Sequence, residues 1–222
     1  MAEKSLHDLF VEELRDMYDA EKRLTRALPK LAKAAGSREL QTAFTNHLRE
    51  TEQQIARLEE VFETIGEKAR GKKCDGIMGI IEESNKAIEE LDGPVLDAAL
   101  IAGAQKVEHY EIASYGTLAY FAELMGHEEA KSLLGETLEE EKATDEKLSA
   151  IARSKVNREA LTGGHAERDE QDDEGVTLST PRAVRSAAES LGLAHDKPAG
   201  GRKATRGATK RKASSTQGRK KR

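Results

Sequence analysis

The feature that most constrains the fold of this chain is a single glutamate inside an otherwise apolar line. At alternating spacings of four and three residues, the first segment gives Phe10, Leu14, Met17, Glu21, Leu24, Leu28 and Leu31. This spacing predicts a long helix with one buried face. Because an ionised carboxylate buried alone costs many kcal/mol, Glu21 must be paired, protonated or bound to a cation.

The same arrangement recurs 90 residues later in the chain. The matching positions are Leu100, Ala104, Val107, Glu111, Ser114, Leu118 and Phe121. Two inward glutamates on two related helices predict a metal site inside a four-helix bundle.

The second helix of each half repeats in the same register. The corresponding pairs are Leu48 with Leu138, Leu58 with Leu148 and Glu50 with Glu140. Glu50 follows Glu21 by 29 residues, as Glu140 follows Glu111. We therefore expect a pseudo-twofold axis to place these four glutamates around one point.

The predicted fold is all-α: a ferritin-like antiparallel four-helix bundle. Long helices are expected over residues 5–35, 38–65 and 94–125, and a fourth from the tight turn at 126–129 to about 155; Ser5 and Asp8 form a partial capping box, and Gly36 and Gly66 are stops. Pro29 should kink the first helix or break it near Leu28. Residues 67–94 are predicted to be a long crossover containing a short helix that ends at Leu91, which distinguishes ferritin-like bundles from simple up-down ones.

Composition agrees with long helices, since 35% of residues are charged, 37% are hydrophobic and Trp is absent.

The single Cys74 excludes an intramolecular disulfide and suits a reducing compartment. No apolar run approaches the ~18 residues of a membrane span. We expect a cytoplasmic protein without a membrane partner.

Composition also predicts the domain organisation. Residues 1–157 should form the bundle, 158–179 an acidic linker, 180–195 a short helix capped by Thr180, and 196–222 a disordered basic tail. The net charge of −5 includes +11 from Lys and Arg in residues 197–222, which leaves −16 for the rest.

Carboxylates and imidazoles suit iron or manganese, and di-metal bundles draw one Glu from each of two helices and Glu-x-x-His from each of the others. The candidate ligands on the first three long helices are Glu21, His47, Glu50, Glu108 and Glu111. The fourth helix offers Glu140, Glu141 and Asp145 but no His. His47 precedes Glu50, the reverse of the usual order, so the predicted site is carboxylate-rich.

Four segments carry a resemblance to a known family: Phe10–Glu21, His47–Leu58, Lys106–Tyr115 and Thr137–Asp145. The sequence resembles the YciE/YciF family of bacterial stress proteins over roughly residues 5–153. That resemblance implies a ferritin-like bundle, often dimeric, related to rubrerythrins and ferritins. It implies Glu21, Glu50, Glu111 and an acid of the fourth helix as metal ligands, with His47 beside them.

Each assignment has a structural alternative. Glu21 and Glu111 could form buried ion pairs with Arg or Lys, His47 could be a hydrogen-bonded core histidine, and Glu50 could lie on a solvated face. Tyr18, Tyr110 and Tyr115 are expected in the core, and Cys74 is expected to be an inert packed thiol.

The basic tail predicts a different kind of function. Its positive residues include Lys203, Arg206, Lys210, Arg211, Lys212, Arg219, Lys220, Lys221 and Arg222, and it contains no aromatic residue. Such an arm binds nucleic acid phosphates without sequence preference, so nucleoid association is expected; the alternative is that it lies on the acidic bundle.

The first hypothesis is therefore a homodimeric stress protein with two iron ions that couples iron oxidation to oxygen or peroxide, held near DNA by its tail. The second is a non-catalytic, DNA-associating bundle with structural buried acids. The third is a manganese or iron site that decomposes peroxide.

Overall fold

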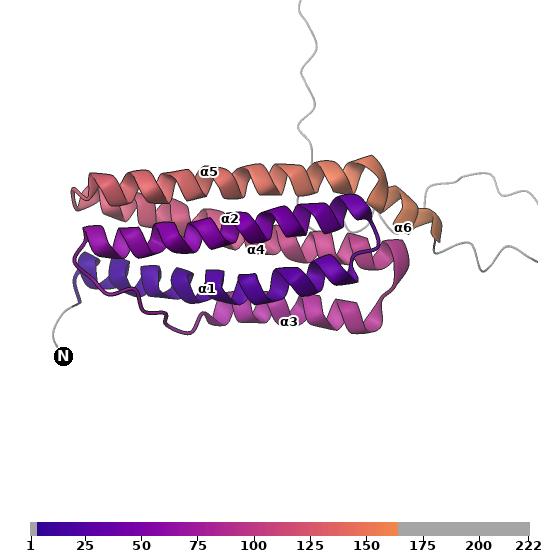
Figure 1. The fold of residues 1–222 in the computed structure, drawn as a ribbon, viewed down its shortest axis with the longest axis horizontal. Helices are drawn as coiled ribbons and strands as arrows, with labels where there is room; N and C mark the ends of the chain where they lie inside the picture. The colour runs from indigo at the N-terminus through magenta and orange to yellow at the C-terminus, as the bar shows by residue number, and fades with distance from the viewer. Residues whose placement is uncertain (1–3, 164–222) are drawn as a thin grey trace, which may run out of the picture. The chain divides into compact units, whose positions relative to one another are not determined.

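The computed structural model describes residues 4–163 (Figure 1). These residues form helices α1 (Leu6–Ala34), α2 (Arg38–Thr64), α3 (Asp75–Glu90), α4 (Gly93–Leu124), α5 (Glu128–Ile151) and α6 (Asn157–Gly163), with a π-helical turn over Ala152–Val156. No strand occurs within the described residues. The all-α prediction is confirmed.

The four long helices pack as a bundle in which α1 and α5 each lie against both α2 and α4. Neighbouring helices run in opposite directions (Figure 1). Consequently α2 and α4, on one diagonal, run in the same direction, and the chain must travel back along the bundle to join them. Helix α3 makes this return and packs against α1 and α4. The predicted ferritin-like bundle with a long crossover is confirmed.

Local capping explains where the first helices begin and end. The Ser5 hydroxyl accepts a hydrogen bond from the Asp8 amide at 3.1 Å, and the Asp8 carboxylate accepts one from the Ser5 amide at 2.8 Å. This reciprocal pair is a complete capping box. Gly66 and Gly126, just beyond the ends of α2 and α4, adopt φ of +73° and +75°, which favours glycine.

Pro29 does not break the first helix near Leu28, which was one of the two outcomes predicted for it. Helix α1 continues through Pro29 to Ala34. Proline removes the hydrogen bond that would reach the carbonyl of residue 25, which costs most where water is excluded. Because Pro29 is exposed and Thr25 is only partly buried, solvent can satisfy that carbonyl.

The buried line of α4 departs from the predicted one beyond Glu111. Tyr115 and Ala122 are fully buried, whereas Ser114 and Phe121 are only partly buried. A helix places both i+3 and i+4 beside a given residue, so the sequence spacing alone does not decide between them. The consequence is that a tyrosine, and not a serine, lies next to the inward acids.

The bundle's last helix extends further than predicted. The linker was expected to begin at residue 158, but α6 runs to Gly163 and packs against α4. The remainder of the acidic linker, the predicted helix over 180–195 and the basic tail lie outside the described residues. Within residues 4–163, none of the helices combines the length and the apolar character that crossing a membrane requires.

Candidate metal centre

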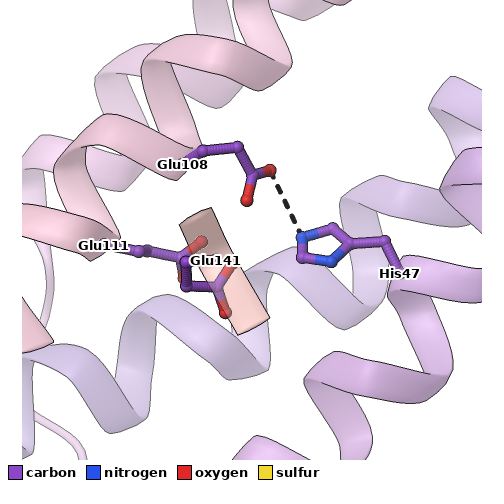
Figure 2. A group of neighbouring side chains, drawn as sticks. All are labelled: His47, Glu108, Glu111 and Glu141. Carbon is purple, nitrogen blue, oxygen red and sulfur yellow. Dashed lines mark ion pairs between the residues drawn. The ribbon is translucent and has the colours of Figure 1, made fainter. Parts of the chain in front are cut away.

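Carboxylates from three helices converge in the interior of the bundle. Glu21 comes from α1, Glu108 and Glu111 from α4, and Glu141 from α5, and each is no more than 1% exposed. His47 of α2 completes the group, and Figure 2 shows it together with Glu108, Glu111 and Glu141. One ligand atom from each of His47, Glu108, Glu111 and Glu141 lies within 4.8 Å of the others.

Helical spacing explains why these side chains share one face. Glu108 and Glu111 are three residues apart on α4, so they lie side by side on its inner face. On α2 the inner polar positions are His47, Thr51 and Gln54, all buried and spaced by four and three residues. Each of the four long helices therefore presents polar groups at the same level of the bundle.

Two neutral side chains hold the carboxylates in place. The Tyr115 hydroxyl donates a hydrogen bond to Glu21 Oε1. The Gln54 amide donates one to Glu141 Oε1 and another to Glu140 Oε2, the latter at 3.1 Å. These bonds fix one oxygen of Glu21 and one of Glu141, and the second oxygen of each has no hydrogen-bond partner.

Many ligand-type atoms in the centre have no hydrogen-bond partner. They are Glu21 Oε2, both His47 ring nitrogens, Gln54 Oε1, Glu108 Oε2, both Glu111 carboxylate oxygens and Glu141 Oε2. Buried polar atoms are nearly always satisfied, and each exception costs roughly 1–3 kcal/mol. A cluster of such atoms from four helices fits a cation that they would share.

The electrostatics of the centre favour protonated acids when no cation is present. Burial, followed by the nearby Glu141 carboxylate, raises the pKa of Glu21 to about 8. Burial also raises the pKa values of Glu108 and Glu111 well above their ordinary range, with further contributions from Glu141 and Glu21 respectively. Burial raises the pKa of Glu141 as well.

Among the described residues, no Arg or Lys forms an ion pair with any of the four buried acids, which was the structural alternative for Glu21 and Glu111. The ion pair that involves the four buried acids joins His47 Nε2 to Glu108 Oε1 at 3.4 Å (Figure 2). Arg57 lies nearby on α2, but its guanidinium bonds to Glu136 and Glu140 at 2.8–2.9 Å. One histidine cannot neutralise four carboxylates, so protons or metal ions must do so.

Three candidates from the sequence lie outside this buried group. Glu50 has a side chain that is 43% exposed, with its Oε2 3.5 Å from His47 Nδ1. Glu140 is paired with Arg57. Asp145 accepts a hydrogen bond from Gln105 at 3.1 Å and lies 3.6 Å from His109 Nδ1.

The ninety-residue repeat contains a signal that the glutamate pairing missed. Shifting Thr51 by 90 gives Glu141, and shifting Gln54 gives Thr144. Thr51-x-x-Gln54 and Glu141-x-x-Thr144 thus stand where a di-metal bundle has Glu-x-x-His. Burial follows this register, since both Thr51 and Glu141 are fully buried.

Comparison with known proteins agrees with this architecture. Protein YciF of Escherichia coli is 54% identical over 159 residues, which cover 71% of this chain and 96% of YciF. The crystal structure of the E. coli stress protein YciF superposes with a TM-score of 0.67 at 52% identity, covering 70% of this chain and 99% of that one.

YcfI of Rhodopseudomonas palustris, described as a candidate structural protein, superposes with a TM-score of 0.64 at 47% identity, covering 66% of this chain and 94% of that one. Residues 5–161 match the family described as a domain of unknown function, DUF892. The predicted resemblance to YciF is therefore confirmed, and this chain belongs to the DUF892 family.

Proposed function

We propose that the interior of this bundle binds two transition-metal ions, iron or manganese, and that the protein acts in a stress response by controlling their redox chemistry. The first ion would be held by His47, Glu108, Glu111 and Glu141. The second would draw on Glu21 and share Glu111 and Glu141 with the first. Oxygen and imidazole ligands of this kind suit iron and manganese.

The observation that carries this proposal is the set of buried ligand atoms without hydrogen-bond partners. The centre contains both oxygens of Glu111, both ring nitrogens of His47 and one oxygen of each remaining acid. A core selected for stability alone would replace such groups by apolar side chains, since buried ionisable clusters are often costlier than hydrophobic ones. Metal binding would satisfy these atoms together.

The surrounding residues have roles that follow from their contacts. Tyr115 orients Glu21, and Gln54 orients Glu141. Partners of this kind around ligands typically change metal affinity 10- to 100-fold. Phe10, Leu14 and Met17 are fully buried on α1, one to three turns from Glu21, and keep bulk water from the interior.

Bound iron would supply the capacity to react with oxygen or hydrogen peroxide, which limits radical damage under stress. Gln54 and Thr144 occupy the two positions that are histidines in Glu-x-x-His bundles, and the one histidine of this centre, His47, lies one turn before Thr51. We therefore propose that the carboxylates dominate the ligand set. The E. coli relative is described as a stress protein, which supports the physiological part of this proposal.

A second candidate function is a non-catalytic bundle whose inward acids are structural. Two observations favour it: the hydrogen bonds to Glu21 and Glu141 stabilise those acids without metal, and raised pKa values allow them to stay protonated. The R. palustris relative is described as a candidate structural protein.

Metal content distinguishes the two functions. Protein loaded anaerobically with Fe(II) and desalted should retain about two iron ions per chain, as di-metal carboxylate bundles do. The Glu111→Gln variant should lose them, while Glu139→Gln, a matched change at an exposed residue of α5, should not. Wild-type protein without stoichiometric metal would leave the structural function as the better account.

A further inference from the structure

We infer that metal ions reach the centre between α2 and α5, through a narrow passage whose outer end is Glu50. This inference rests on the proposed metal site and adds a role for residues that lie outside the buried group. In it, Glu50 is a transient ligand that passes cations inward, and not a permanent ligand of the bound metal.

A small cavity is lined both by members of the buried group and by exposed residues of α2 and α5. His47 and Glu108, both members of the buried group, line its inner end. Glu50, Thr144 and Lys147 line it towards the surface. With a volume of about 10 Å³ it accommodates roughly one water molecule, so a cation would pass only after losing most of its hydration shell.

The ligand atoms along this cavity form a continuous line from solvent to interior. The side chains are 43% exposed at Glu50, 5% at His47 and 1% at Glu108. Neighbouring atoms are 3.5 Å apart between Glu50 and His47 and 3.4 Å apart between His47 and Glu108. A cation losing water at the surface could therefore exchange it for protein ligands one at a time.

The charges at the outer end are arranged to attract a cation without trapping it. Glu50 carries the negative charge there, and the ammonium group of Lys147 is close enough to act on it electrostatically. Lys147 is exposed and belongs to the next turn of α5 after Thr144. The carboxylate draws cations to the opening, and the lysine weakens their binding there so that they move on.

Further along the α2–α5 interface, an arginine occupies the space between the two helices. Arg57 lies across it and bonds to Glu136, Glu140 and the hydroxyl of Thr137. A guanidinium held by these three partners fills the gap between the two helices at this level. Because Arg57 occupies one part of the α2–α5 interface and Glu50 the other, cations would enter at Glu50.

The experiment is a stopped-flow measurement of Co²⁺ uptake by metal-free protein, which avoids oxidation. Glu50→Gln should slow uptake about 5- to 10-fold, because removing one charge from a focusing cleft lowers the association rate. Glu52→Gln removes the same charge from an exposed position on α2 and should leave the rate unchanged. Lys147→Gln should speed uptake about 2- to 3-fold, and these differences should shrink in high salt.

Equilibrium binding separates the outcomes. The passage is supported if Glu50→Gln binds as many Co²⁺ ions as wild type at saturation but acquires them slowly. It is overturned if Glu50→Gln and Glu52→Gln load equally fast, or if Glu50→Gln binds fewer ions at saturation, which would make Glu50 a permanent ligand. Wild-type protein that binds no Co²⁺ would instead refute the proposed function, and the passage with it.

Discussion

His47 Nε2 on α2 lies 3.4 Å from Glu108 Oε1 on α4, and both side chains are almost completely buried. These two helices are diagonal members of the bundle, so the contact crosses its centre. Among the described residues, His47 is the one basic side chain that lies within ion-pair distance of any of the four buried carboxyl groups. The interior of the bundle therefore requires either bound protons or bound metal, and each state has measurable consequences.

The stability of the metal-free protein should fall as pH rises. A buried acid with a raised pKa keeps its proton in the folded state at pH values where the unfolded chain has lost it. For Glu21 that window extends from about 4.5 to about 8. Its contribution to stability is complete below pH 4.5 and is lost as pH rises through the window. Thermal melting of metal-free protein at several pH values should show this decrease.

Glu21→Gln provides the control for that pH dependence. The variant lacks one titrating group, so the slope of unfolding free energy against pH should become less negative by about 1.4 kcal/mol per pH unit. Metal-loaded protein should behave oppositely, because ligands must be deprotonated and affinity rises with pH. A melting temperature of metal-free wild type that stays constant between pH 5.5 and 8 would contradict the account.

Tyr115→Phe should weaken metal binding without replacing any proposed ligand. The substitution removes the hydroxyl that donates to Glu21 and leaves another buried oxygen unsatisfied. We expect the free energy of unfolding of the metal-free protein to fall by about 1–3 kcal/mol and metal binding to become roughly tenfold weaker. Tyr120→Phe, at a residue of α4 that is 57% exposed, is the matched control and should change neither quantity. Equal metal affinity in the two variants would exclude an orienting role for Tyr115.

Asp97→Ala should destabilise the bundle at the turn between α1 and α2. The buried Asp97 carboxylate on α4 accepts hydrogen bonds from the backbone amides of Gly36 and Ser37, both at 2.7 Å. Removing this carboxylate should lower the free energy of unfolding, measured by chemical denaturation, by about 2–3 kcal/mol. Asp92→Ala, at the exposed start of α4 where no side-chain cap forms, should cost less than about 0.5 kcal/mol. Similar losses in both variants would show that Asp97 does not fasten this turn.

Deleting residues 197–222 tests the prediction that the tail binds nucleic acid. The deletion removes eleven positive charges and no negative ones. Full-length protein should bind duplex DNA with an association constant that falls steeply as salt is added. In a plot of the logarithm of this constant against the logarithm of salt concentration, each contacted phosphate should contribute about −0.9 to the slope. The truncated protein should lose this binding and keep the same melting temperature. Retained, salt-sensitive binding after truncation would refute a role for the tail.

The fold could be predicted because its signals are local and repeated. The apolar line through Phe10, Leu14 and Met17 and the capping box at Ser5 belong to single helices, and short turns force antiparallel neighbours. The sequence also placed the crossover helix. It could not decide whether Pro29 breaks the helix, because that depends on the solvation of the carbonyl four residues earlier, which is a tertiary property.

The sequence singled out two site residues because each interrupts an apolar line, and it named His47, Glu108 and Glu141 by residue type and spacing; these three also lie in the buried group. The two that interrupt an apolar line are Glu21 and Glu111, and both are fully buried. Glu50 and Glu140 were paired by their equal spacing from those residues, but the inner face of α2 runs through His47, Thr51 and Gln54. Contiguous acids such as Glu139–Glu141 span most of a helix circumference, so the inward one is decided by packing. The homodimer likewise stays a prediction from the sequence.

The most direct test of the central claim is an anomalous difference map from crystals of the protein loaded with Mn²⁺ or, anaerobically, with Fe²⁺. We expect a strong peak among His47, Glu108, Glu111 and Glu141, and a second one beside Glu21. Peaks confined to the exposed surface, with the interior acids hydrogen-bonded to one another, would contradict a metal centre and establish the buried carboxyl groups as structural.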